Sequence, residues 1–167
     1  MKTVLLFRHA KSDWNADYDD DHDRPLAPRG KTAASMMGKY LARVGEVPDL
    51  VITSSAVRAK LTAERAMKAG EWDCATKVSG ELYTQSSKEV LRALREQDDS
   101  VESLLLVGHG PALWELAAAL IGGGKFGFPT AAMARIDFAA NSWREVEPGD
   151  GVLTWYVTPK LIDRLGL

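Results

Sequence analysis

Two apolar runs, each ending at a histidine, most constrain what this chain can fold into. The first is V-L-L-F-R-H-A-K-S at residues 4–12, and the second is L-L-L-V-G-H-G at residues 104–110. A short continuous apolar run that stops at charged or small residues is typical of a strand buried on both faces. Taken alone, Arg8 and His9 could equally be a strand end and a hydrogen-bonded histidine. If the two strands are parallel neighbours, however, His9 and His109 emerge at the same sheet edge, where open α/β sheets bind ligands.

Helix and strand signals alternate along the rest of the chain. Pro28 suits a first helical position, and residues 31–44 carry apolar residues at helical spacing. Further helices are expected over residues 56–69 (capped by Ser54 or Ser55), 88–97 and 112–121, with a short one at the end. Further strands are expected over residues 49–53, 72–78, 103–107, 133–138, 143–146 and 153–157. This alternation predicts one α/β domain over residues 1–167, with a mostly parallel central sheet and helices on both faces.

Length and composition are those of an ordinary globular domain. The chain has 167 residues, of which 46% are hydrophobic and 26% charged, enough for one buried core. The formal charge of -2 gives no electrostatic reason to expect nucleic acid or a membrane as partner. Cys74 is the single cysteine, which suits a reducing compartment, and no apolar run approaches the roughly 20 residues of a membrane span. We therefore expect a cytoplasmic protein.

An acidic segment, D-Y-D-D-D-H-D at residues 17–23, follows the first strand. A calcium-binding loop starting at Asp17 needs glycine at its sixth position and glutamate at its twelfth, where this chain has His22 and Pro28. A solvated loop fits the segment better, and its place after the expected site makes it a candidate for selecting substrates.

Arg58 lies in the first turn of the helix expected over residues 56–69. Cations are disfavoured there because the free N–H groups already make that end positive. Either Arg58 points to solvent, which costs a few tenths of a kcal/mol, or an anion binds at the site and both the arginine and the helix end contact it.

The residues expected at strand ends and helix starts are cations, imidazoles and hydrogen-bond donors: Arg8, His9, Ser12, Asn15, Arg58 and His109. Guanidinium forks and backbone N–H groups suit the three oxygens of a phosphoryl group. The chain has no phosphate-loop or dinucleotide-binding motif, and no cofactor or dedicated metal cage is expected.

Four motifs resemble those of the histidine phosphatase superfamily and occur in the same order. They are R-H-A-K-S at residues 8–12, R-P-L-A-P-R-G at 24–30, S-S-A-V-R-A-K-L-T-A-E at 54–64 and V-G-H-G-P at 107–111. The chain is most similar to the short SixA-type phosphohistidine phosphatase branch. The resemblance implies a three-layer, phosphoglycerate mutase-like α/β fold without a lid domain.

The resemblance also implies roles for the matching residues. His9 would be the nucleophile that forms a covalent phosphohistidine, without a metal or cofactor. Arg8, Arg58 and a protonated His109 would form the rest of the phosphate pocket, and their charges would lower the pKa of His9. Ser12 and Asn15 match polar positions that touch phosphate in some members, and Arg24 matches an arginine near the site in the short branch.

The proton donor is the open question, because the element that carries it in larger members is shortened. Glu81 and Asp21 are the candidates, and surface carboxylates explain both equally well. A weak acid suits cleavage of a P–N bond, since imidazole leaves more readily than an alkoxide. We therefore expect a phosphorylated protein as partner, such as a histidine phosphotransfer domain, with phosphohistidine as substrate. The alternatives are a small phosphoester hydrolysed by a phosphomonoesterase, a mutase, a metal hydrolase and a non-catalytic phosphate-binding module.

Overall fold

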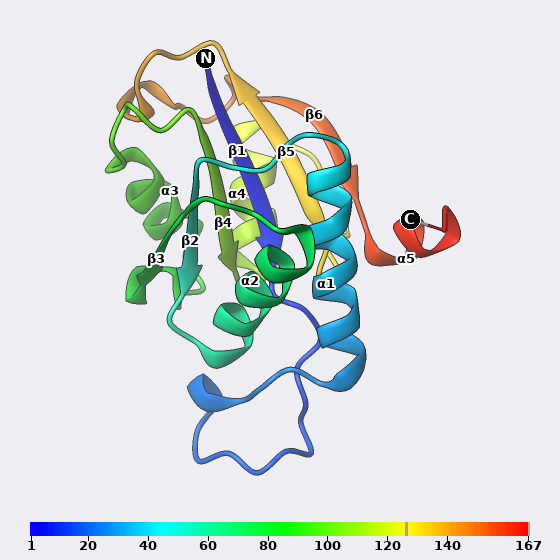
Figure 1. The fold of residues 1–167 in the computed structure, drawn as a ribbon. Helices are drawn as coiled ribbons and strands as arrows, with labels where there is room; N and C mark the ends of the chain where they lie inside the picture. The colour runs from blue at the N-terminus through cyan, green and yellow to red at the C-terminus, as the bar shows by residue number, and fades with distance from the viewer. Residues whose placement is uncertain (126, 167) are drawn as a thin grey trace.

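A computed structural model of the chain describes residues 1–125 and 127–166. Its centre is a mixed six-stranded sheet in the order β3-β2-β4-β1-β5-β6 (Figure 1). The strands are β1 (Lys2–Arg8), β2 (Leu50–Ser54), β3 (Ala75–Ser79), β4 (Ser103–Gly108), β5 (Met133–Phe138) and β6 (Val152–Val157). The first four are parallel, whereas β5 pairs antiparallel with both β1 and β6. The predicted α/β class and mostly parallel sheet are confirmed.

Helices cover both faces of the sheet and give a three-layer structure. The helices are α1 (Pro28–Arg43), α2 (Val57–Gly70), α3 (Ser87–Arg95), α4 (Ala112–Leu120) and α5 (Pro159–Arg164), and the 3-10 turns are η1 (Asp21–Asp23), η2 (Gly80–Leu82) and η3 (Trp143–Glu145). Figure 1 shows α1, α2 and α5 on one face and α3 and α4 on the other. Among the described residues, no helix is both long and apolar enough to span a membrane.

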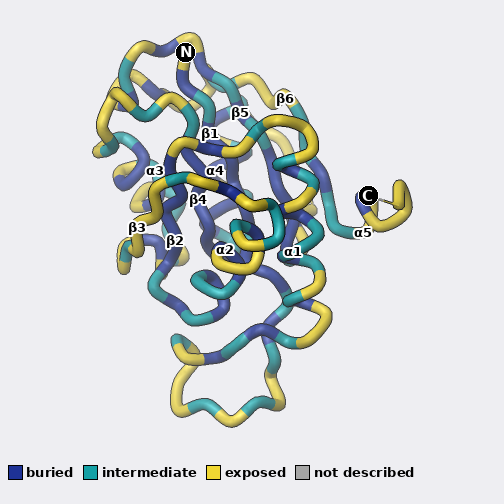
Figure 2. Tube along the Cα trace, viewed as in Figure 1, coloured by how far each residue is buried: buried dark blue, intermediate teal, exposed yellow. Residues whose placement is uncertain are grey.

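Successive residues of β1 belong to opposite halves of the core. Val4 and Leu6 pack with apolar residues of α3 and α4, whereas Leu5 and Phe7 pack with those of α1 and α2. Side chains alternate across a strand, so a strand covered on both faces requires a continuous apolar run rather than an alternating one. Figure 2 shows the buried strands at the centre and the exposed loop after β1 below them.

The register of β1 against β4 brings the two histidine motifs together. Phe7 pairs with Val107 and Arg8 with Gly108, and the His9 amide donates to the Gly108 carbonyl over 2.9 Å. The residues that follow this last pair are His9 and His109, and both therefore lie at the same edge of the sheet. The neighbouring parallel strands on which the sequence hypothesis depends are present.

The prediction of a strand over residues 143–146 is wrong, because residues 143–145 form the 3-10 turn η3. Trp143 is fully buried. Its amide donates to Asp99 Oδ1 over 2.8 Å, and its indole Nε1 donates to the Val101 carbonyl over 2.9 Å. The bond to Asp99 satisfies the backbone donor of Trp143 that a strand would have used for sheet pairing, and the bond to Val101 fixes its ring.

Gly38 sets the spacing between α1 and α2, and its replacement gives a direct test of this packing. A Cβ at position 38 would lie 2.1 Å from the carbonyl oxygen and 2.5 Å from the Cα of Ala66. Backbone atoms cannot yield as a flexible side chain can, so the two helices must separate. We expect Gly38→Ala to lower the free energy of unfolding by about 3 kcal/mol, measured by urea denaturation.

Gly80→Ala is the matched control for this measurement, because a Cβ at position 80 meets nothing within 4 Å. Equal losses in the two variants would show that the close approach of α1 and α2 does not limit stability.

Candidate active site

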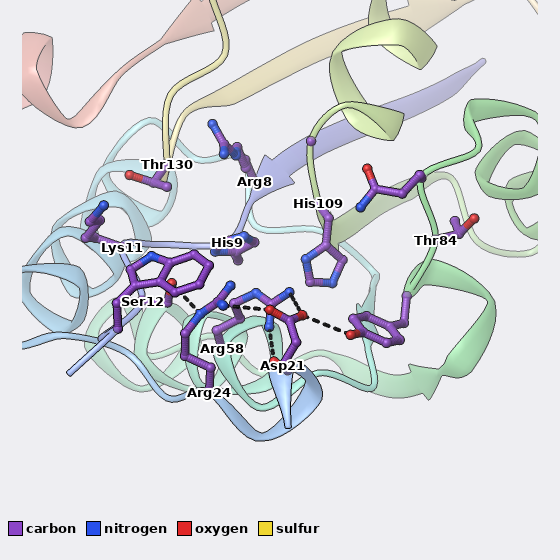
Figure 3. Close-up of a pocket in the computed structure, with 14 residues that line it drawn as sticks. Arg8, His9, Lys11, Ser12, Asp21, Arg24, Arg58, Thr84, His109 and Thr130 are labelled. Carbon is purple, nitrogen blue, oxygen red and sulfur yellow. Dashed lines mark hydrogen bonds and ion pairs between the residues drawn. The ribbon is translucent and has the colours of Figure 1, made fainter. Parts of the chain in front are cut away.

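A pocket of about 500 Å³ lies where β1 and β4 end (Figure 3). The structure brings seven of the residues singled out in the sequence to its wall: Arg8, His9, Ser12, Asp21, Arg24, Arg58 and His109. They come from the ends of β1 and β4, from the loop between β1 and α1, and from the first turn of α2. Segments far apart in the chain therefore meet at the carboxyl ends of two parallel strands, the edge where open α/β sheets bind ligands.

The His9 ring is held in one tautomer by its own loop. Its Nδ1 lies 2.8 Å from the carbonyl oxygen of Ala10. A carbonyl only accepts hydrogen bonds, so Nδ1 carries the proton and Nε2 keeps its lone pair in the neutral ring. The Ala10 amide in turn donates to Thr62 Oγ1 over 2.9 Å, which fixes the loop against α2.

Burial is the main cause that lowers the pKa of His9 to about 3. The hydrogen bond to Ala10 opposes this shift, and the positive charges at Arg58 and Arg8, together with His109, add to it. Like-charge repulsion was expected to lower this pKa, and desolvation proves to be the larger cause. The ring is neutral at neutral pH, as a nucleophilic imidazole requires.

His109 lies beside His9, with the ring centroids 5.0 Å apart. Its Nε2 lies 2.8 Å from Ser54 Oγ, and its buried Nδ1 has no partner among the described residues. Burial, followed by the charge of Arg58, lowers its pKa to about 4 although Asp21 acts to raise it. His109 is therefore neutral at neutral pH in the phosphate-free pocket, whereas the resemblance implied a protonated ring in the phosphate pocket.

Ser54 forms a hydrogen bond with His109 rather than capping α2. The helix begins after Ala56, which provides no side-chain cap, and Ser54 Oγ accepts a 3.3 Å bond from the Ala56 amide ahead of the helix. The expected serine cap is thus replaced by a hydroxyl that orients an imidazole.

Arg8 and Arg58 approach the two imidazoles with part of their hydrogen-bonding capacity unused. Arg8 Nη1 donates to the Phe128 carbonyl over 2.8 Å. The Nε atoms of both arginines are buried and have no hydrogen-bond partner among the described residues. Buried donors are normally satisfied, so an oxygen-rich ligand in the pocket would complete this arrangement.

Asp21 bridges Arg24 and Arg58. Its Oδ1 accepts from Arg24 Nη1 over 2.6 Å, and its Oδ2 accepts from Arg58 Nη2 and from the Tyr83 hydroxyl, both over 2.9 Å. Arg58 Nη1 also donates to the Asp21 carbonyl over 2.6 Å. Arg24 is fixed further by Ser12, whose hydroxyl accepts from its Nε over 3.0 Å. Figure 3 shows these contacts as dashed lines.

Asp21 is ionised in this structure. Partial burial acts to raise its pKa, but the hydrogen bond from Tyr83 and the charges of Arg58 and Arg24 outweigh burial and lower it. A carboxylate in this state has no proton to give. The candidate proton donor nearest the imidazoles is therefore an acceptor in the free protein.

Two residues expected near the site lie elsewhere. Asn15 is exposed and does not line the pocket; its amide donates to Asp13 Oδ1 within the loop. Glu81 also lies outside the pocket wall, where it forms an exposed 3.1 Å ion pair with Arg92. The structure does not bring either residue to the pocket, because loop conformation rather than distance along the chain sets their positions.

Two aromatic residues at the pocket were not identified from the sequence. Trp14 is 63% exposed, and its ring lies 3.6 Å from the Arg24 guanidinium carbon. Tyr83 is 41% exposed and lies edge-on to His109, with ring centroids 5.5 Å apart. A tryptophan within a polar segment was the sequence signal that could have pointed to Trp14. No sequence signal pointed to Tyr83, since it reaches the site only through the tertiary fold.

The acidic segment does not form a metal cage in the part of the chain that the structure describes. No group of three or more histidine, cysteine, aspartate or glutamate side chains gathers there in a way that could hold an ion. Asp20 Oδ1 instead accepts from the His22 amide, and Asp21 faces the arginines.

The pKa values of the two pocket histidines predict an unusual titration. We expect the His9 and His109 rings to stay neutral as the pH falls through 6.5 and to gain protons only near pH 3 and 4. NMR of the ring C–H signals measures this, with His9→Ala and His109→Ala assigning them. A midpoint near 6.5 for either ring would show that burial does not control its ionisation.

Comparisons with known proteins agree with this geometry. The model of the histidine phosphatase superfamily (branch 1) matches residues 4–77. An uncharacterized protein from Mycobacterium tuberculosis is 34% identical over 163 residues, covering 92% of this chain and 99% of the relative.

Solved structures share the fold over nearly the whole chain. The protein histidine phosphatase SixA complexed with tungstate matches with a TM-score of 0.82 and 24% identity, covering 96% of this chain and 99% of that one. A provisionally named phosphohistidine phosphatase SixA from Agrobacterium tumefaciens matches with a TM-score of 0.81 and 28% identity, covering 95% and 98%. The chain therefore belongs to the histidine phosphatase superfamily, and its fold is that of the SixA structures.

Proposed function

We propose that this protein is a phosphatase that forms a covalent phosphohistidine on His9 and takes phosphohistidine in a protein as its substrate. The observation that carries the proposal is the hydrogen bond from His9 Nδ1 to the Ala10 carbonyl. It leaves the Nε2 lone pair available on a neutral ring in a pocket lined by Arg8, Arg58 and His109. Membership of the superfamily supports phosphatase chemistry at this position.

In the first step, His9 Nε2 attacks phosphorus while the bond from phosphorus to the leaving nitrogen breaks. The leaving imidazole takes the bonding electrons and departs neutral, because its other nitrogen is already protonated. The His9 ring becomes positive as the new bond forms, and the Ala10 carbonyl that accepts from Nδ1 stabilises this charge. The positive charges of Arg8 and Arg58 stabilise the negative charge on the phosphoryl oxygens.

In the second step, water attacks phosphorus and the bond to His9 Nε2 breaks. Both protons of the water stay with the released phosphate, and the neutral His9 ring is restored. Neither step requires the ionised Asp21 to supply a proton. This is why the proposed leaving group is an imidazole, which departs without the general acid that an alkoxide needs.

The substrate is tested by comparing phosphate release from a histidine-phosphorylated carrier protein, a phosphoserine peptide and a simple alkyl phosphate, each with a chelator present. We expect the carrier protein to have the highest kcat/KM and the chelator to have no effect. Faster turnover of the alkyl phosphate would indicate a small-molecule phosphomonoesterase. Binding of the phosphorylated carrier without phosphate release would indicate a binding module, and inhibition by the chelator would indicate a metal hydrolase.

A further inference from the structure

The pocket has a cationic wall and an anionic edge. Arg24 and Arg58 are each 5% exposed, whereas the Asp21 side chain between them is 50% exposed. The same loop carries Asp19 and Asp20, which are also exposed. A ligand that enters would place its anionic part against the arginines and a part of different charge near Asp21.

Two buried nitrogen atoms of the residues that line the pocket have unused hydrogen-bonding capacity. Arg58 Nε and His109 Nδ1 are buried and have no partner within the described residues, and both side chains belong to residues that are only 5% exposed. A phosphoryl oxygen can accept from Arg58 Nε, and also from His109 Nδ1 in the tautomer that carries its proton there. This observation is independent of the carboxylates and favours the wall formed by Arg58 and His109 as the phosphoryl position.

The Asp21 carboxylate retains capacity to bind a donor from the substrate. A carboxylate offers about four acceptor positions, and three donors among the described residues contact it, from Arg24, Arg58 and Tyr83. Oδ1 accepts one of these bonds and Oδ2 accepts two. One acceptor position therefore remains on Oδ1, on a side chain that is half exposed.

We propose that Asp21 is a specificity-determining residue that accepts a hydrogen bond from the protonated imidazole of the substrate phosphohistidine. The proposal rests on the proposed function and identifies which form of the leaving group the site selects. A protonated phosphoimidazole carries its negative charge on the phosphoryl oxygens and its positive charge on the ring, which matches the charges of the arginines and of Asp21. A phosphate ester offers no such cation, so the carboxylate repels it.

The first test compares Asp21→Asn with the parent on two substrates, a histidine-phosphorylated carrier protein and p-nitrophenyl phosphate. The amide has the shape of the carboxylate without its charge. We expect kcat/KM for the carrier protein to fall roughly 10- to 100-fold, the value of a lost charge-assisted hydrogen bond. For p-nitrophenyl phosphate we expect kcat/KM to rise, because the repulsion is removed.

Asp19→Asn, on the same loop but outside the pocket wall, is the matched control and should leave both rates unchanged. The opposite response of the two substrates is the decisive readout, since damage to Arg24 or Arg58 would slow both together. Equal losses on the two substrates would overturn the proposal and make Asp21 a positioning residue for the arginines.

A binding measurement separates this inference from the proposed catalysis. His9→Ala cannot form the covalent intermediate, so it can be titrated calorimetrically with a phosphohistidine peptide and with a phosphoserine peptide. We expect it to prefer phosphohistidine roughly tenfold or more, and the added Asp21→Asn change should abolish this preference. Preference without turnover by the parent would refute only the proposed catalysis, whereas turnover without preference would refute only the role of Asp21.

Discussion

Phosphate release by His9→Ala should fall by about 10⁴-fold or more relative to the parent. The buried ring provides the nucleophilic nitrogen, and its Nδ1 contact with Ala10 sets which nitrogen is free. The alanine variant has no atom that can bond to phosphorus, so no covalent intermediate forms. Incubation with radiolabelled substrate followed by rapid denaturation should trap labelled protein for the parent and none for the variant.

His22→Ala is the matched control for the loss of an imidazole. His22 does not line the pocket, and its Nε2 instead lies 3.0 Å from Ser55 Oγ. We expect this variant to keep most of the activity and to be labelled like the parent. Labelled His9→Ala protein would show that another residue carries the phosphoryl group, and circular dichroism of each variant checks that the fold is retained.

Arg58→Lys should lower kcat/KM by about 100- to 1000-fold even though the positive charge is kept. The guanidinium reaches the Asp21 side chain and carbonyl through two nitrogens, and its buried Nε has no hydrogen-bond partner among the described residues. An ammonium is a single point of positive charge and cannot make these contacts together. The loss should appear mainly in kcat, because charge accumulates on the phosphoryl oxygens in the transition state.

Arg65→Lys is the control for this change, because Arg65 is exposed on the same helix α2. It should leave the kinetics unchanged. A small effect at Arg58 would mean that charge alone, rather than the geometry of the fork, stabilises the reacting group. Thermal unfolding of both variants tests for a loss of stability from the broken contact with Asp21.

The sequence was informative wherever a local pattern has a single physical solution. The apolar run before Arg8 predicts a strand buried on both faces, and the structure confirms β1 between helices on both faces. The matching run before His109 predicts a second buried strand, and the structure shows that this strand, β4, lies beside β1 and parallel to it. Periodicity therefore placed a histidine at the end of each strand, and the observed sheet order brings His9 and His109 to one edge.

The same approach failed where loops decide the outcome. Asn15 and Glu81 were placed at the site from their positions along the chain, and both lie outside the pocket wall. Loop residues make few repeating contacts, so their sequence does not fix where their side chains point. Tyr83 reaches the pocket from the segment after η2, a contact that no local pattern indicated.

The sequence by itself determined the α/β class, the mostly parallel sheet and the four residues Arg8, His9, Arg58 and His109 that meet in the pocket. The fold class and the positions of Arg8, His9 and His109 depend on hydrophobic periodicity and on strand ends, which local residues specify. Arg58 was singled out at a helix start, and the set of four residues was implied by the resemblance to the histidine phosphatase motifs. The tertiary structure alone decided the ionisation of the site: burial keeps His9 and His109 neutral, and three converging side chains keep Asp21 charged. Ionisation depends on desolvation and on neighbours from distant segments, and both exist only once the chain is folded.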